Sequence, residues 1–289
     1  AAALLVALVL VTAKNRQVQA AESRAVASFT AADGLLETIV DDWLGSKHLF
    51  GRGAADFDLA QRVMDQAASL WRDEPDRQAA LHHNLATAFD EAGDFDVAQE
   101  LYLSALTIRS SLFGGWGEPT LQTAGNYGNL LQERGRYRDA EKWLQSALDG
   151  WVQLHGEEAL VTLEARNDLA LLLADRGEIE QALSELEFVH TMRLQLLCAD
   201  DVLTNAAKIN LADLLATVGQ LDRAEALAEA ALDSLNALEP EVGRMEALRA
   251  SRVLGNIEIA REQSSPAALN NGVKHLESAF FAQGQLLGV

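Results

Sequence analysis

Apolar and small residues recur along this chain with a period of 42 residues. Each unit has a large apolar residue, a small residue directly after it, a glycine eight residues after the apolar one, and an alanine five residues further on. The apolar residues are Leu85, Tyr127, Leu169 and Leu211, the glycines are Gly93, Gly135, Gly177 and Gly219, and the alanines are Ala98, Ala140, Ala182 and Ala224. A fixed period of this length is typical of stacked repeats, whose units bury their apolar faces against their neighbours.

Within one unit the pattern predicts two helices joined by a tight turn. In the second unit we expect a first helix over residues 119–133, a turn at 134–136 and a second helix over 137–152 that is closed by Gly156. The chain has only four prolines, and the stretches between them are rich in strong helix formers. The sequence therefore predicts an all-α fold, a right-handed α-solenoid of helix–turn–helix repeats.

The ends of the chain depart from the regular pattern. Residues 57–72 resemble a lone second helix that serves as a cap, and residues 246–260 resemble a fifth first helix, whose partner at 268–281 follows a six-residue insertion. We therefore expect a capping half-repeat and linker over residues 45–75. Four regular units and one atypical unit would then occupy residues 76–281, and a tail residues 282–289.

The first thirteen residues are uncharged and mostly apolar, and Lys14 and Arg16 follow them. As a helix they would span about 20 Å, whereas a bilayer core needs about 20 residues. We expect residues 1–13 to be the C-terminal part of a truncated transmembrane helix in a single-pass membrane protein. A signal peptide that is cleaved after Val11-Thr12-Ala13 and a buried core helix are the alternatives.

The following segment, residues 14–44, carries apolar residues at helical spacing from Val18 to Trp43. We expect a juxtamembrane helix here. Its apolar stripe would either form a coiled coil that makes a homodimer or pack on the first repeat.

The order of residues in each unit resembles the tetratricopeptide repeat. Such units usually have 34 residues, and here eight more lie between the second helix and the next first helix. That layout is similar to the kinesin-light-chain type, whose signature resembles Leu112-Phe113-Gly114, Tyr127-Gly128-Asn129-Leu130-Leu131 and Gly135-Arg136-Tyr137-Arg138-Asp139-Ala140-Glu141. The resemblance implies a module that binds a peptide or a partner protein in a concave groove lined by the first helices.

The layout of the whole chain resembles the C-terminal region of bacterial membrane-anchored serine/threonine protein kinases. An apolar segment, a juxtamembrane helix and a half-repeat that ends at Asp73-Glu74-Pro75 precede the repeats. The resemblance implies an upstream kinase domain and a sensor role for the repeats, and a winged-helix transcriptional regulator is the alternative. Lys14 and Arg16 favour a cytoplasmic position for the repeats, while the kinase layout places them outside.

The chain carries no sign of chemistry of its own. It has no kinase glycine-rich loop, His-Arg-Asp or Asp-Phe-Gly, and its histidines lack metal-ligand spacing. Cys198, the only cysteine, stands at the repeat position of Gly114 and Gly156, so we expect it to be a small residue at a helix end. We therefore expect no catalytic residue, no cofactor and no metal, and hence not an enzyme.

The net charge of −20 argues against nucleic acid as a partner, because phosphate contacts need clustered Lys and Arg. It indicates either a solvated acidic surface or an acidic groove for a basic peptide.

The candidate binding residues form a polar column nine residues before each turn glycine: Asn84, Asn126, Asp168 and Asn210. Amides here could hydrogen-bond an extended peptide backbone, or they could bond neighbouring helices instead. The groove neighbours would be His83, Thr87, Asn129, Asn167 and Lys208. Glu164 and Asp168 occupy the heights where a basic clamp for a C-terminal carboxylate would stand. The sequence thus predicts a protein-interaction module, with an oligomerisation scaffold or a periplasmic or secreted repeat protein as the alternatives.

Overall fold

A computed structural model describes residues 62, 64, 65, 68, 69, 71–238 and 243–262 of the chain. The expected membrane segment at 1–13, the juxtamembrane helix at 14–44, most of the half-repeat at 45–75, the last helix at 268–281 and the tail at 282–289 lie outside these residues. None of the helices within the described stretches has an apolar run that would cross a bilayer.

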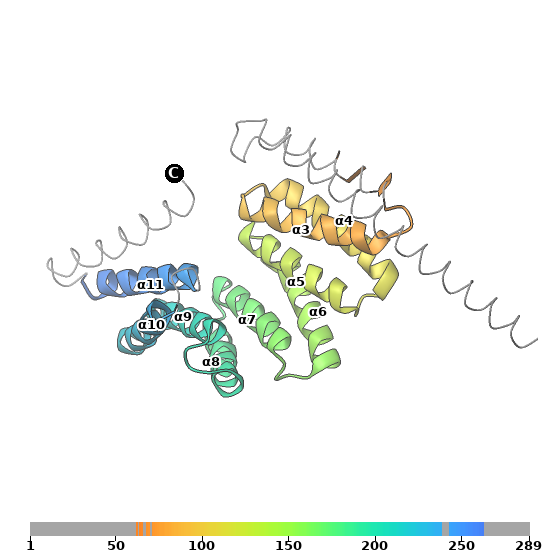
Figure 1. The fold of residues 1–289 in the computed structure, drawn as a ribbon. Coiled ribbons are helices and arrows are strands. Elements are labelled where there is room, and N and C mark those ends of the chain that lie inside the picture. Colours follow the sequence, from red (N-terminus) through yellow and green to blue (C-terminus); the bar gives the residue numbers. More distant parts are fainter. Residues whose placement is uncertain (1–61, 63, 66–67, 70, 239–242, 263–289) are drawn as a thin grey trace, which may run out of the picture. The chain divides into compact units, whose positions relative to one another are not determined.

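The described part of the chain is helical, as the sequence predicts (Figure 1). We call the first helix of each unit an A helix and the second a B helix. The A helices are α3 (Pro75–Glu91), α5 (Glu118–Glu133), α7 (Leu160–Asp175), α9 (Val202–Thr217) and α11 (Arg244–Glu262). The B helices are α4 (Phe95–Phe113), α6 (Tyr137–His155), α8 (Ile179–Leu196) and α10 (Leu221–Asn236).

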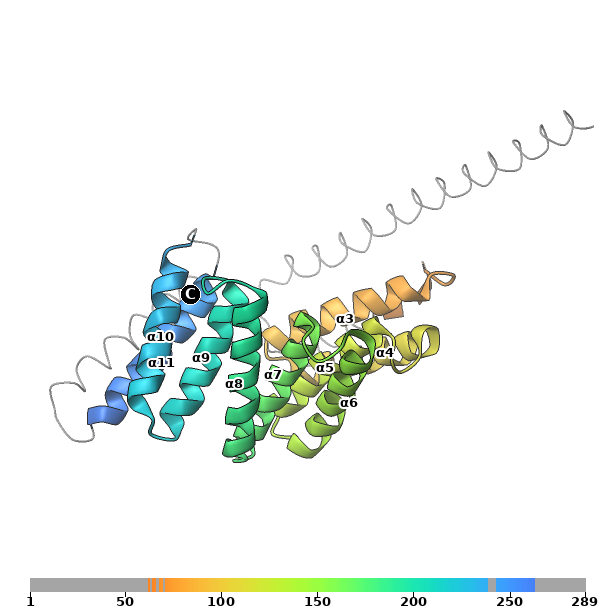
Figure 2. The same cartoon turned by 90° about the horizontal axis from the view of Figure 1, so that it is seen from below.

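The chain divides into two compact units that are larger than the repeats, residues 1–130 and 131–289, with the boundary inside α5. From here on, the first unit and the second unit mean these two parts of the chain. In the first unit α3 packs on α4. In the second unit each helix from α6 to α11 packs on the next, and α9 also contacts α11 (Figures 1 and 2).

The periodic glycines close the A helices by one repeated hydrogen-bond pattern. Each has φ between 70° and 81°, the left-handed region that side chains disfavour. The amide after the glycine donates back to the carbonyl five residues earlier, from Asp94 to Phe89 over 2.8 Å and from Arg136 to Leu131 over 2.8 Å. This closure turns the chain sharply into the B helix, which explains why the glycine recurs in each regular unit.

The periodic small residues lie where A and B helices meet. Ala86, Ala98, Ala140, Ala170, Ala182, Ala212 and Ala224 are all fully buried, and Gly128 is buried too. Leucines fill the space beside them: Leu131 and Leu215 are fully buried, and Leu211 is 3% exposed. Because these residues are small, the A and B helices can approach each other closely.

Cys198 lies just beyond the end of α8. Gly114 and Gly156 end α4 and α6 with φ of 75° and 84°. In the third regular unit α8 ends at Leu196, and no described non-glycine residue has a positive φ. Cys198 is exposed and does not take over the glycine conformation, because a β-carbon makes that conformation costly.

Candidate peptide-binding face

Polar side chains of the A helices make a face in each unit, which we call the A face. In the first unit Asn84 is exposed on α3, while its neighbour His83 is buried and Thr87 is half-buried. The Thr87 hydroxyl donates to the His83 carbonyl over 3.2 Å and lies 3.2 Å from the hydroxyl of Tyr102, which α4 contributes. Asn126 of α5 is half-buried and hydrogen-bonds the same Tyr102.

Tyr102 organises this part of the A face. The residue is 1% exposed, and burial raises the pKa of its hydroxyl to about 12. Its ring meets that of His83 edge-on at 5.9 Å and lies 6.3 Å from the ring of Tyr127. Among the residues predicted to contact a ligand in this unit, Asn84 is therefore the exposed one.

His83 is a neutral core residue rather than a surface ligand. Burial, with a contribution from the charge of Arg109, lowers the pKa of its imidazole to about 4. Its Nδ1 is buried and has no hydrogen-bond partner. The neighbouring His82 is also buried, and its Nδ1 lies 2.9 Å from the Ser104 hydroxyl.

In the second unit the predicted residues form a hydrogen-bonded chain across three A helices. Asn210 of α9 is 7% exposed, and its Nδ2 donates over 2.8 Å to Oδ1 of Asn167 on α7. Arg249 of α11 donates to Asn210 Oδ1 and pairs with Glu246 over 2.7 Å. Asn167 Nδ2 in turn lies 3.5 Å from Oδ1 of the half-buried Asp168. Asn167 and Asn210 thus bond neighbouring helices, which is one of the two roles that the sequence left open.

The cations of this face are likewise engaged inside the protein. Lys208 is buried, and its Nζ donates to the carbonyl of Ala199 over 2.8 Å and to Oδ1 of Asn205 over 2.9 Å. Burial lowers the pKa of its ammonium group. Asn129 is half-buried on α5, in the other unit. Lys208 is therefore not an exposed cation of the kind that a carboxylate clamp needs.

Two structural columns were not predicted from the sequence. Arg109 and Arg193 stand 84 residues apart and are 6% and 4% exposed. Arg109 Nη1 donates to the carbonyl of Pro119 over 2.9 Å, and Arg193 Nη1 to that of Leu203 over 3.1 Å, in each case the second residue of the next A helix. A threonine three residues into α5, α7 and α9 donates to a carbonyl at the end of the preceding B helix or just beyond it; these are Thr120, Thr162 and Thr204. Because the three threonines recur every 42 residues, the repeat pattern of the sequence contains a signal for this column.

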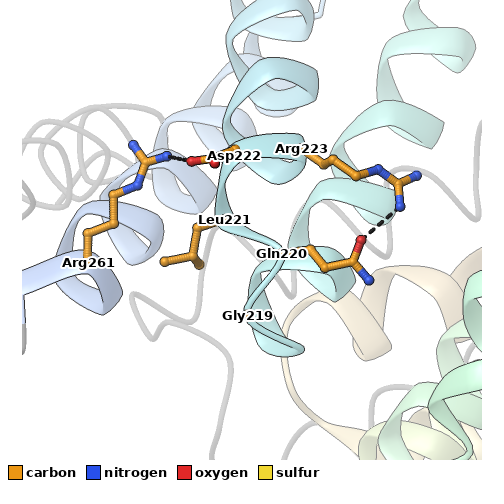
Figure 3. Close-up of a pocket in the computed structure, with 6 residues that line it drawn as sticks. All are labelled: Gly219, Gln220, Leu221, Asp222, Arg223 and Arg261. Atoms are coloured by element: carbon orange, nitrogen blue, oxygen red, sulfur yellow. Dashed lines mark hydrogen bonds and ion pairs between the residues drawn. The ribbon is translucent and has the colours of Figure 1, made fainter.

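A shallow pocket of about 460 Å³ lies at the turn between α9 and α10 (Figure 3). Arg261 of α11 reaches across it to Asp222, and Arg223 donates to Gln220 over 2.8 Å. Arg261 also pairs with Glu225 over 2.7 Å.

Arg261 stands 42 residues after Gly219, so the fifth repeat lacks the turn glycine and α11 runs on to Glu262. Its charge is used to tie α11 to α10, so the pocket offers no free cation to a ligand.

No group of three or more acidic, histidine or cysteine side chains in the described residues could hold a metal ion.

Comparison with known proteins agrees with this architecture. One similar structure contains the TPR-like repeats of a kinesin light chain from Podosopora anserina. It aligns with this chain at 20% sequence identity and a TM-score of 0.55, over 74% of this chain and 98% of its own. The BtubC (BKLC) structure from P. vanneervenii aligns with 18% identity and a TM-score of 0.62 over 83% of this chain and 94% of its own. At these identities the likeness concerns the fold. A comparison with curated protein sequences returns no match.

The sequence profile of the tetratricopeptide repeat matches residues 52–111 and 119–194, and a second profile of the same repeat matches residues 205–230. Together these stretches make up more than half of the chain, which therefore belongs to the tetratricopeptide repeat family.

Proposed function

We propose that this chain binds an extended peptide segment of a partner protein through its A face. The observation that carries the proposal is the exposed amide of Asn84 on α3, which stands at the same repeat position as the half-buried Asn126 of α5. An amide both donates and accepts a hydrogen bond, so it can pair with a peptide backbone of any sequence. Tetratricopeptide repeats are interaction modules, and a binding role agrees with that.

In the second unit Asp168 is the half-buried column residue that we assign to contact. Asn167, Asn210 and Lys208 are buried and bonded within the protein, so we assign them to holding the A helices in register. The carboxylates on this face, Glu164 and Asp168 among them, favour a neutral or basic segment over an acidic one.

Replacing Asn84 with alanine should weaken peptide binding about fivefold, because one net hydrogen bond contributes about 1 kcal/mol. The probe is an extended peptide selected by phage display against the folded chain, with its Kd measured by fluorescence polarisation. Ser110→Ala, which also truncates an exposed polar side chain to alanine but on α4, should leave the Kd within twofold. Equal values for Asn84→Ala and wild type would remove Asn84 from the binding face.

The proposal includes a larger setting, in which the repeats are the sensor region of a membrane protein with an upstream serine/threonine kinase domain. The apolar run at residues 1–13 and the layout that follows it support this setting. Membrane fractionation of the full-length membrane protein that this setting implies checks the tether. The wild type should stay with the membranes after a carbonate wash, and Leu5→Arg combined with Val9→Arg should release it. Retention of the double variant would contradict the tether.

A further inference from the structure

The B helices α6 and α8 border a pocket of about 560 Å³, with α7 beneath it. Both helices pack on α7. The side chains of α7 therefore make the bottom of the pocket. Asn84 and Asn126 lie on other helices, α3 and α5, whereas Asp168, the contact assigned above in α7, directly precedes Leu169 of the pocket lining.

Part of the pocket lining is apolar. It comprises Leu148 and Val152 of α6 and Leu169 and Leu173 of α7. Leu148 is 7% exposed, and the other three are only half-buried. An apolar side chain of a ligand would cover this remaining surface. The burial would stabilise the complex by about 25 cal/mol for each Å² of apolar area removed from water.

The rim of the pocket is acidic. Its carboxylates come from α6, from the connection to α7, and from the start and middle of α8: Glu141, Asp149, Glu157, Glu178 and Glu185. The amides of Gln145 and Gln181 lie between them.

Two arginines offset part of this charge. Arg166 lies 4.7 Å from the ring centre of Phe188, 2.7 Å from Glu185 and 3.8 Å from Glu157. Arg176 pairs with Glu141 over 2.6 Å and with Glu178 over 2.8 Å. Five carboxylates against two arginines leave an excess of three negative charges around an apolar bottom. Charge complementarity therefore selects a cationic occupant that also carries an apolar side chain.

We propose that this pocket docks a basic segment of a partner protein, in which one or two leucine-sized side chains sit on the α7 leucines while flanking Arg or Lys residues pair with the rim. Because the pocket and Asn84 lie on different helices, the two surfaces can take different segments.

Three fluorescein-labelled nonapeptides serve as probes of the whole chain, with the central sequences Arg-Leu-Leu-Arg, Glu-Leu-Leu-Glu and Arg-Gly-Gly-Arg. Their Kd values are measured by fluorescence polarisation at 0.1 M salt. Arg-Leu-Leu-Arg should bind at least tenfold more tightly than either counterpart, because only this probe matches both the rim and the bottom. Equal binding of the acidic probe, or no binding of Arg-Leu-Leu-Arg, would overturn the proposal.

A matched pair of variants locates the site. Gln181→Arg adds a positive charge to the rim without touching the core and should weaken Arg-Leu-Leu-Arg binding at least tenfold. Gln195→Arg makes the same change at an exposed position of α8 that does not line the pocket, about 21 Å further along the helix. At that distance salt screens the added charge, so the Kd should stay within twofold. Equal effects of the two variants would overturn the proposal. Asn84→Ala should leave this probe unaffected, so failure here is distinguishable from failure at the A face.

Discussion

Lowering the pH from 7 to 4 should lower the free energy of unfolding by about 3 kcal/mol through His83 alone. Its pKa is about 4 in the folded chain and about 6.5 in an unfolded one. Between these values the unfolded state binds a proton that the folded state does not, so stability is lost as the pH falls through this window. Burial lowers the pKa of His82 and of His190 as well, so both act in the same direction.

Urea unfolding at pH 7 and pH 4, followed by circular dichroism, separates this effect from that of the carboxylates. His83→Gln should lose about 3 kcal/mol less stability than the wild type between the two pH values. His155→Gln makes the same substitution at a residue that is exposed at the end of α6 and serves as the control for the substitution itself. If the stability of His83→Gln depended on pH as strongly as that of the wild type, the claim that the His83 imidazole is neutral in the folded chain would be refuted.

Replacing Arg193 with methionine should lower the free energy of unfolding by about 3 kcal/mol. The guanidinium donates to the Leu203 carbonyl at the start of α9, and hydrogen bonds from charged groups contribute about 1.5–3 kcal/mol. Methionine keeps much of the apolar volume but removes the hydrogen bond from the guanidinium to that carbonyl. Carboxylates of Glu164, Asp168, Asp201 and Glu246, which act on the charge of Arg193, would also lose it.

The matched control is Arg223→Met on α10. Arg223 is exposed and pairs with Glu187 over 2.9 Å, and exposed pairs contribute about 0–1 kcal/mol. Urea unfolding at pH 7 compares the two variants. Equal losses would show that Arg193 does not tie the B helix to the next A helix.

The sequence was sufficient for the fold because each periodic residue has one local reason to recur. Gly93 and its equivalents meet a backbone demand that other residues meet at a cost, and Ala98 and its equivalents stand where helices approach most closely. Both demands act within a single unit. A pattern along one chain can therefore display them.

The polar column could be found from the sequence, but its use could not. Asn84 and Asn210 occupy the same repeat position, yet the first is exposed and the second is buried. The difference comes from the partners, because Asn210 meets Asn167 and Arg249, 43 and 39 residues away in the chain. Side chains on adjacent helices decide which amide is left for a ligand. The pocket between α6 and α8 likewise needs three helices to be placed together.

The most direct test of the account is an NMR titration of the isotope-labelled chain with a phage-selected extended peptide, which follows the side-chain amides of the asparagines. The account predicts that the Asn84 amide signals move until the peptide saturates the site, while those of Asn167 and Asn210 stay in place. Movement of the Asn210 signal together with a silent Asn84 would contradict it, because the peptide would then be using the residues that hold the helices together.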